Sequence, residues 1–333
     1  MPTISQRSGG LRNGPRVSRR TAFWFVAGVY TLVMLGGTVP VPLYSFWAPE
    51  FRFGPFTTTL IFAVYAMGTV VSLLFFAAAS DRVGRRPLLL SALGAAAVST
   101  GLFLGAKDVT VLLTARFVFG LATGVFTATA TAALSELSDD PVGAPRPDAS
   151  TVASAANAGG LGLGAVFAGI FAQEMRDPTH LVFWIYLAAL LPAAVAVYLT
   201  PETVADQQRP ILAVRRPALP ASDGRGPFFS AAVAVFAAFA VAGLFSSLVP
   251  TFLQSDLKVT NHAVIGGEVA LFFAAALAAQ TAARGRALAS RRLPGTGLAV
   301  GIIFVQAGLL TRSLPAFVVG TLVSGAAFGL VLR

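Results

Sequence analysis

Ten apolar segments of about the same length fill most of this chain, and they constrain its fold more than any other feature. A helix needs about 20 residues to cross the roughly 30 Å hydrocarbon core of a bilayer. We therefore expect spanning helices over residues 21–44, 57–79, 87–106, 110–134, 151–173, 180–199, 228–250, 262–283, 293–311 and 313–332. Only 11% of the residues are charged, against about 25% in a soluble domain. The sequence predicts an all-α, polytopic membrane helix bundle.

Composition also excludes several classes of site. The chain has no Cys and 2 His, so it offers neither disulfides nor a thiolate or paired-histidine metal motif. No phosphate-binding glycine loop is followed by Lys and Ser or Thr, which argues against an ATP-driven pump. We expect no enzyme activity, no cofactor and no metal. The net charge of +10 comes from bases in short loops, a distribution that indicates membrane orientation and not nucleic-acid binding.

The basic residues predict the topology. With the N-terminus inside, the inner segments hold 17 of the 24 Lys and Arg residues, as the positive-inside rule requires. Residues 1–20 form a basic tail that we expect to be disordered and cytoplasmic. The chain is then a multi-pass protein of the cytoplasmic membrane, and a monomer is the expected state.

A short charged island, Asp81-Arg82-Val83-Gly84-Arg85-Arg86-Pro87, joins the second and third apolar segments. Gly84 allows a tight turn, and Pro87 suits the first turn of the next helix. One interpretation is an ordinary positive-inside loop. An acid, a glycine and paired bases at this place also resemble the signature loop of the major facilitator superfamily (MFS) of transporters, with Ala77 standing where that family has a glycine.

The order of the predicted helices along the chain also resembles that of the MFS. Residues 201–227 are rich in Pro, Arg and Asp and separate six predicted helices (21–200) from four (228–333). Glu202 lies in a Pro-Glu-Thr sequence often found after the sixth helix of the family. The resemblance implies an MFS-type six-helix N-terminal half, a cytoplasmic linker and an incomplete four-helix C-terminal half. Since the family normally has twelve helices, it also implies a C-terminally truncated chain.

Arg116 lies about one third of the way along the fourth apolar segment. A lone guanidinium at the centre of a spanning helix costs about 2.5–3.5 kcal/mol on insertion scales, so it needs a cavity or a partner. With Gly120 four residues later it resembles the family's fourth-helix motif, which implies a role in proton coupling. Alternatively, Arg116 snorkels to the outer headgroups, which are about 10 Å away along the helix.

Glu268 is the one carboxylate placed inside an apolar segment. Apolar surroundings favour the neutral form of a carboxyl group, so Glu268 is a candidate proton carrier. The alternative is that the eighth helix begins later and Glu268 caps its first turn.

Small residues recur at helical spacing in four pairs: Gly120 and Gly124, Gly160 and Gly164, Gly297 and Gly301, and Gly325 and Gly329. They predict either sliding surfaces or plain tight packing between helices. The glycines from Gly159 to Gly169 resemble the motif of the family's antiporters, although Ala165 replaces its central proline.

Two prolines, Pro40 and Pro42, should kink or unwind the end of the first helix. In the family, helices one, four, seven and ten line the central cavity. Together with a polar residue of the fifth segment, this gives the substrate-cavity candidates Thr38, Tyr44, Thr123, Asn157, Ser246 and Ser247. For Asn157 a hydrogen bond to a neighbouring helix is the alternative.

The resemblance implies secondary active transport of a small molecule by alternating access, with protons and the lipid bilayer as the other partners. We expect proton-coupled efflux of a drug-like or sugar-like compound. In this scheme Asp81, Arg82, Gly84, Arg85 and Arg86 form a gating loop that latches the inward side, and Arg116 and Glu268 couple transport to protons. The alternatives are proton-coupled uptake and a non-transporting remnant of such a protein.

Overall fold

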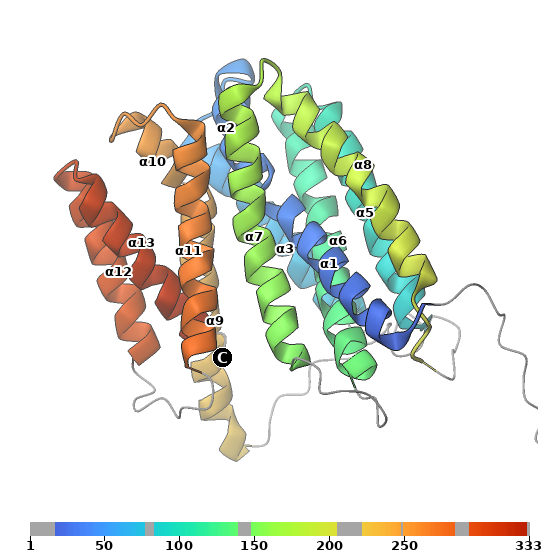
Figure 1. Ribbon diagram of the computed structural model, residues 1–333. Coiled ribbons are helices and arrows are strands. Elements are labelled where there is room, and N and C mark those ends of the chain that lie inside the picture. Colours follow the sequence, from blue (N-terminus) through green and yellow to red (C-terminus); the bar gives the residue numbers. More distant parts are fainter. Residues whose placement is uncertain are drawn as a thin grey trace, which may run out of the picture.

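The computed structural model describes residues 17–76, 83–138, 148–204, 222–247, 249–283 and 293–331, and every regular element in these ranges is an α-helix. In chain order and labelled as in Figure 1, the helices are α1 (Arg19–Thr38), α2 (Pro40–Glu50), α3 (Pro55–Phe76), α5 (Arg85–Leu104), α6 (Val109–Ser138), α7 (Ala149–Glu174), α8 (Pro178–Leu199), α9 (Ser222–Ser247), α10 (Val249–Ser255), α11 (His262–Ala282), α12 (Leu293–Leu310) and α13 (Leu314–Val331).

The helices run up and down through one bundle, so the described turns gather at its two ends (Figure 1). We call the end at which α1 begins the tail end; α13 finishes at this end too. The opposite end, here the far end, holds the turns at residues 51–54, 105–108, 175–177, 256–261 and 311–313.

The predicted spanning segments correspond to the helices of the structure. Within the described residues, eight helices are long and apolar enough to cross a membrane, counting α1 with α2 as one. The bent pair α9 and α10 would make a ninth, and Pro294–Leu310 in α12 is a shorter apolar helix. Each of the ten predicted ranges falls on one of these helices or pairs. The all-α membrane bundle is thus confirmed.

One difference in length concerns the first segment, which continues to Glu50. Pro40 and Pro42 lie in the first turn of α2, where a missing backbone N–H breaks no helical bond. Val39 between α1 and α2 keeps helical backbone angles, and its N–H bonds to the carbonyl of Leu35. The two prolines therefore interrupt the helix without unwinding it.

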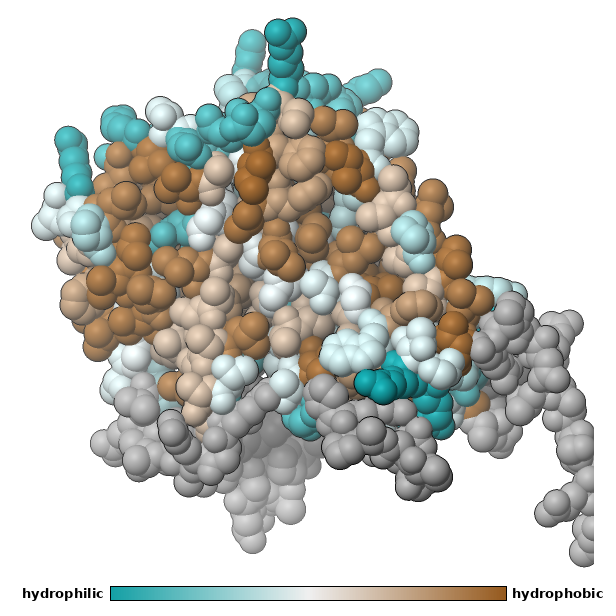
Figure 2. Space-filling model, in the orientation of Figure 1, coloured by the Kyte–Doolittle hydropathy of each residue, from teal (hydrophilic) through white to brown (hydrophobic). Residues whose placement is uncertain are grey.

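The sides of the bundle are apolar, as lipid contact requires. Large side chains such as Phe236, Ile303 and Leu191 are 77%, 65% and 70% exposed. Figure 2 shows hydrophobic residues across the middle of one face, with hydrophilic residues gathered at the ends of the molecule. In water this surface would be a large aggregation-prone patch, whereas in a bilayer it faces hydrocarbon.

Side-chain packing divides the bundle into two halves. One large core joins α1, α5, α6, α7 and α8 through residues such as Tyr30 and Phe126. A second core joins α9 to α13 through Phe245, Phe272 and Phe317, and it includes Val41 and Ala165 of the first half. Residues 205–221, which contain most of the expected linker, lie outside the described residues.

The four glycine pairs all lie at helix–helix contacts: Gly120 and Gly124 against α3, Gly160 and Gly164 against α1, Gly297 and Gly301 against α13, and Gly325 and Gly329 against α11. The contacts are too close for a side chain. A Cβ on Gly164, for example, would lie 2.1 Å from the carbonyl oxygen of Leu35. Sliding surfaces and plain tight packing both need this close approach, so both interpretations of these pairs stay predictions.

A second glycine face of α7 joins the two halves. A Cβ on Gly169 would lie 2.7 Å from the carbonyl oxygen of His262 in α11, and one on Gly266 would lie 2.2 Å from that of Ala165. Gln173 accepts a hydrogen bond of 2.9 Å from the backbone N–H of His262. We call this contact between α7 and α11 the seam; the two helices lie close at the far end and diverge toward the tail end (Figure 1).

The seam gives a first prediction. Gly266→Ala should lower the melting temperature of the detergent-purified protein by roughly 2–6 °C, because overpacking costs about 1–3 kcal/mol. Its neighbour Gly267 faces open space, so Gly267→Ala is the matched control and should leave the melting temperature equal or higher, since Ala favours helix over Gly. Equal melting of the two variants would contradict the close contact.

Candidate functional site

Arg116 of α6 is fully buried, at 0% exposure, between α6 and the first segment. Its Nε donates to the hydroxyl of Tyr44 over 2.5 Å. Its Nη1 donates to the carbonyl of Gly37 over 2.7 Å. The Tyr44 and Tyr65 rings lie 5.4 and 5.5 Å from the guanidinium carbon, within cation–π range. The protein itself therefore solvates this cation.

This arrangement decides between the two interpretations of Arg116. A snorkelling arginine extends toward the headgroups and stays wet at its tip, whereas the tip of Arg116 is enclosed. The snorkelling alternative was wrong. Arg116 also keeps unspent donors, because its Nη2, which carries two N–H groups, is buried without a hydrogen-bond partner among the described residues. A buried donor of this kind is costly and marks a candidate functional site.

A charged cluster lies at the tail end of the first half. Arg85 forms a salt bridge of 2.7 Å with Glu136 at the end of α6, and Thr203 donates a short hydrogen bond to the same carboxylate. Glu202 accepts the backbone N–H groups of Arg85 and Arg86, at 2.8 and 3.1 Å. These N–H groups have no helical partner in the first turn of α5, so Glu202 caps that helix.

The turn before α5 has the geometry predicted for it. Gly84 has a positive φ of 107°, a conformation that favours glycine, and Pro87 lies in the first turn of α5. The guanidinium carbon of Arg86 lies 4.2 Å from the centre of the Tyr198 ring. Asp81 and Arg82 lie outside the described residues. The contacts of Arg85 and Arg86 described above are with residues of the first half, and a latch to the second half stays a prediction.

Glu268 is 7% exposed and lies in the second turn of α11. The helix begins at His262, and Asn261 caps it by accepting two backbone N–H groups. The alternative in which Glu268 caps the first turn was therefore wrong. Instead, its carboxylate accepts a hydrogen bond of 2.5 Å from Thr321 of α13. A carboxyl group is thus held between two spanning helices of the second half.

Three of the other candidates bond to neighbouring groups. Asn157 donates to the hydroxyl of Tyr30 over 3.1 Å, so the alternative of a bond to another helix is the one observed. Thr38 donates to the carbonyl of Leu161 in α7 over 2.5 Å. Thr123 donates to Phe119 in its own helix. Ser246 is buried at 2% exposure.

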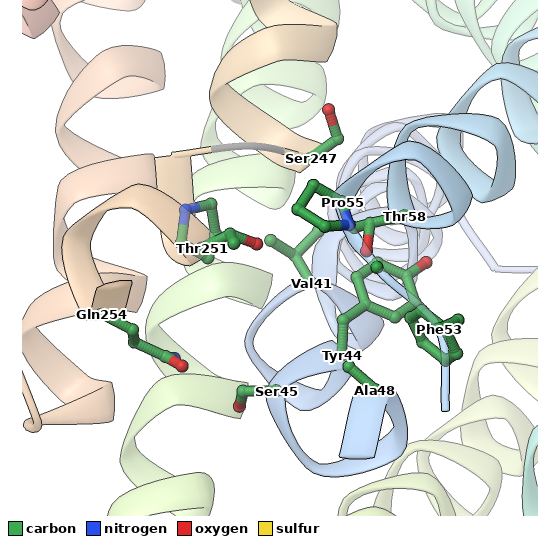
Figure 3. A pocket seen from close by; sticks show the side chains of 12 residues that line it. Val41, Tyr44, Ser45, Ala48, Phe53, Pro55, Thr58, Ser247, Thr251 and Gln254 are labelled. Carbon is green, nitrogen blue, oxygen red and sulfur yellow. The ribbon is translucent and has the colours of Figure 1, made fainter. Parts of the chain in front are cut away.

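A cavity of about 220 Å³ lies between the halves at the far end. Tyr44 and Ser247 line it, so the structure brings these two candidates together (Figure 3). Ser45, Thr58, Thr251 and Gln254 complete its polar lining, and sequence reasoning missed them. Arg116 is not part of the lining but contacts it through Tyr44. In the part of the chain that the structure describes, no cluster of His, Asp and Glu could hold a metal ion.

Two packed helical halves, buried charges within spanning helices and a cavity between the halves define a membrane transport protein of the helix-bundle class. A family model described as Major Facilitator Superfamily matches residues 26–332. The chain therefore belongs to the major facilitator superfamily, as its motifs predicted.

A curated relative matches over a short stretch. The major facilitator-type transporter psiT2 of Psilocybe cubensis is 45% identical over 86 residues, which are 26% of this chain and 16% of that protein. The match thus spans less than a fifth of the relative.

Solved structures match over nearly the whole chain. A bacterial homologue of the human lysosomal transporter Spinster, inward-facing and unoccupied, has a TM-score of 0.70 at 18% identity and covers 96% of this chain and 75% of its own. The occupied form of the same protein has a TM-score of 0.71 at 19% identity, and the match covers 96% of this chain and 74% of that one. The human organic anion transporter MFSD10 (TETRAN) has a TM-score of 0.62 at 18% identity, and the match covers 95% of this chain and 84% of that one. At these identities the likeness shows the fold.

The Arg116 site gives a second prediction. Tyr44→Phe removes the acceptor of the Arg116 Nε–H and should destabilise the protein by about 1–3 kcal/mol. Tyr186→Phe is the control, because the Tyr186 hydroxyl is buried without a partner among the described residues and its removal should cost little. Thermal unfolding of both purified variants measures the difference. A Tyr186→Phe variant as unstable as Tyr44→Phe would contradict the assigned bond.

Proposed function

We propose that this chain is a secondary active transporter that exports a small molecule in exchange for protons. The observation that carries the proposal is the pair of ionisable side chains, Arg116 and Glu268, held inside the spanning helices of the two halves. Buried charges in lipid are expensive and usually mark substrate or ion pathways. A drug-like or a sugar-like compound is the expected substrate.

Alternating access supplies the mechanism. The halves meet along the seam, whose helices are close at the far end and diverge toward the tail end (Figure 1). With the tail end in the cytoplasm, as the basic residues predict, this arrangement is inward-facing. Rocking about the seam would then open the far end and close the tail end. The Asp81–Arg86 loop is our candidate for the latch that holds the closed tail end.

Glu268 is our candidate for the proton site. Its bond to Thr321 Oγ1 links α11 to α13, and protonation of the carboxyl would remove the charge that this contact holds. The neutral form of Glu268 is easier to bury than the charged form, because burying a carboxylate costs several kcal/mol. Arg116 would take part through its free Nη2 donor, which an anionic or carbonyl group could accept.

A flux assay tests the proposal. In everted vesicles with an acidic lumen, an antiporter accumulates substrate as protons leave; we suggest ethidium as the drug-like probe and radiolabelled sorbitol as the sugar-like probe. Glu268→Gln should abolish the part of the flux that depends on the pH gradient, because the amide does not take up and release a proton as a carboxyl group does. Glu174→Gln, an exposed site at the end of α7, is the matched control and should keep full flux.

The same vesicles separate the alternatives. Proton-coupled uptake would show as accumulation in right-side-out vesicles with acid outside, and not in everted ones. Gradient-dependent flux that survives Glu268→Gln would remove the proton role of this residue. A lack of gradient-dependent flux for both probes, with correct insertion, would favour the non-transporting remnant.

A further inference from the structure

The far-end cavity has walls from both halves of the bundle. Tyr44 and Ser45 extend from α2, and Thr58 lies in the first turn of α3. Thr251 and Gln254 extend from α10 on the opposite side (Figure 3). A molecule in this cavity would therefore contact both halves at once.

Of the described residues that line the cavity, half have polar side chains and none carries a charge. The hydroxyl of Ser45 donates its proton to the carbonyl of Pro42, and that of Ser247 donates to the carbonyl of Gly243. Because these protons are in use, each serine oxygen can only accept a hydrogen bond from a ligand. Gln254 supplies a hydrogen-bond donor, because its side-chain Nε2 is buried without a hydrogen-bond partner among the described residues. An unpaired buried amide donor is costly, and a ligand that accepts from it relieves that cost.

Acceptors and a donor on one surface select the chemistry of the ligand. A hydroxyl group can accept from Gln254 and donate its one proton to a serine oxygen at the same time. A carboxylate can accept but has no proton to donate, and it would enter a cavity without a lining cation. An ammonium group can only donate, and the lining holds no carboxylate to balance it.

The size of the cavity narrows the choice. Its volume of about 220 Å³ lies below the roughly 300–1,000 Å³ of pockets that hold drug-sized ligands. It corresponds to about seven water molecules at their share of liquid volume. A compound with a few hydroxyl groups fits this space better than a large apolar one.

We propose that the far-end cavity binds a small neutral polyhydroxy compound, of polyol or monosaccharide size, between α10 on one side and α2 and α3 on the other. Gln254 donates to one of its hydroxyl groups, and Ser45 and Ser247 accept from others. Because both halves contribute, the bound compound stabilises the closed far end. This site deepens the proposed transport function by naming a substrate class, but its binding does not depend on proton coupling.

Direct binding tests the site. The purified full chain in nanodiscs is titrated with sorbitol and with gluconate, which share a carbon skeleton and differ in one carboxylate, without any pH gradient. Sorbitol should bind, and gluconate should bind roughly tenfold or more weakly. Gln254→Leu should weaken sorbitol binding by roughly tenfold, the factor that one buried hydrogen bond contributes. Gln306→Leu, the same change at an exposed position of α12, is the matched control.

Labelling locates the binding independently of affinity. The chain contains no Cys, so Ser45→Cys provides a single thiol at the cavity and Ser255→Cys one on the exposed surface just beyond it. Sorbitol should slow the maleimide reaction of Ser45→Cys and leave that of Ser255→Cys unchanged. This variant pair also serves if Gln254→Leu does not fold.

Four results would overturn the proposal: no sorbitol binding, equal binding of gluconate, unchanged binding by folded Gln254→Leu, or no protection of Ser45→Cys. If sorbitol binds but the flux assay shows no transport, the proposed transport function would be contradicted and the binding site would stand. Ethidium flux without sorbitol binding would leave transport standing and remove this site.

Discussion

The close contact between α7 and α11 is the interaction on which the two-half arrangement depends. Lipid supplies little hydrophobic drive for helix association, so packing of small residues must hold the halves together. At Gly169 and Gly266 the backbones approach to distances that leave no room for a Cβ. The same α7 packs two further glycines, Gly160 and Gly164, against α1. One helix thus belongs rigidly to the first half and offers a smooth face to the second.

The buried charged side chains also have their bonding partners within their own half of the bundle. Arg116 is solvated by Gly37 and Tyr44 of the first half, and Glu268 is held by Thr321 of the second. At the tail end, Glu202 and Glu136 bind the start of α5 and keep the first half together. Each of these charged groups is therefore held by bonds within its own half, and the hydrogen bond from His262 to Gln173 crosses the seam. That separation allows the halves to move without exposing charge to lipid.

Sequence alone predicted the elements well, because the length of an apolar run and the properties of Gly and Pro act locally. The spans, the turn at Gly84 and the glycine contacts are of this kind. Partners far apart in the chain were not predictable: Glu136 lies 51 residues from Arg85 and Thr321 lies 53 from Glu268. The depth of Arg116 was ambiguous for the same reason, since about 10 Å of helix allows either snorkelling or burial. Only the fold brings Tyr44 to it.

Distances between spin labels across the seam test the rocking of the two halves most directly. On the Cys-free chain, the pair Ser150→Cys and Thr281→Cys reports the tail ends of α7 and α11, and Glu174→Cys and Val264→Cys report their far ends. We expect a long tail-end and a short far-end distance in nanodiscs. A Glu268→Gln background, which mimics the protonated carboxyl, should shift the two distances in opposite directions. Two distances that stay fixed, or that change together, would contradict alternating access about the seam.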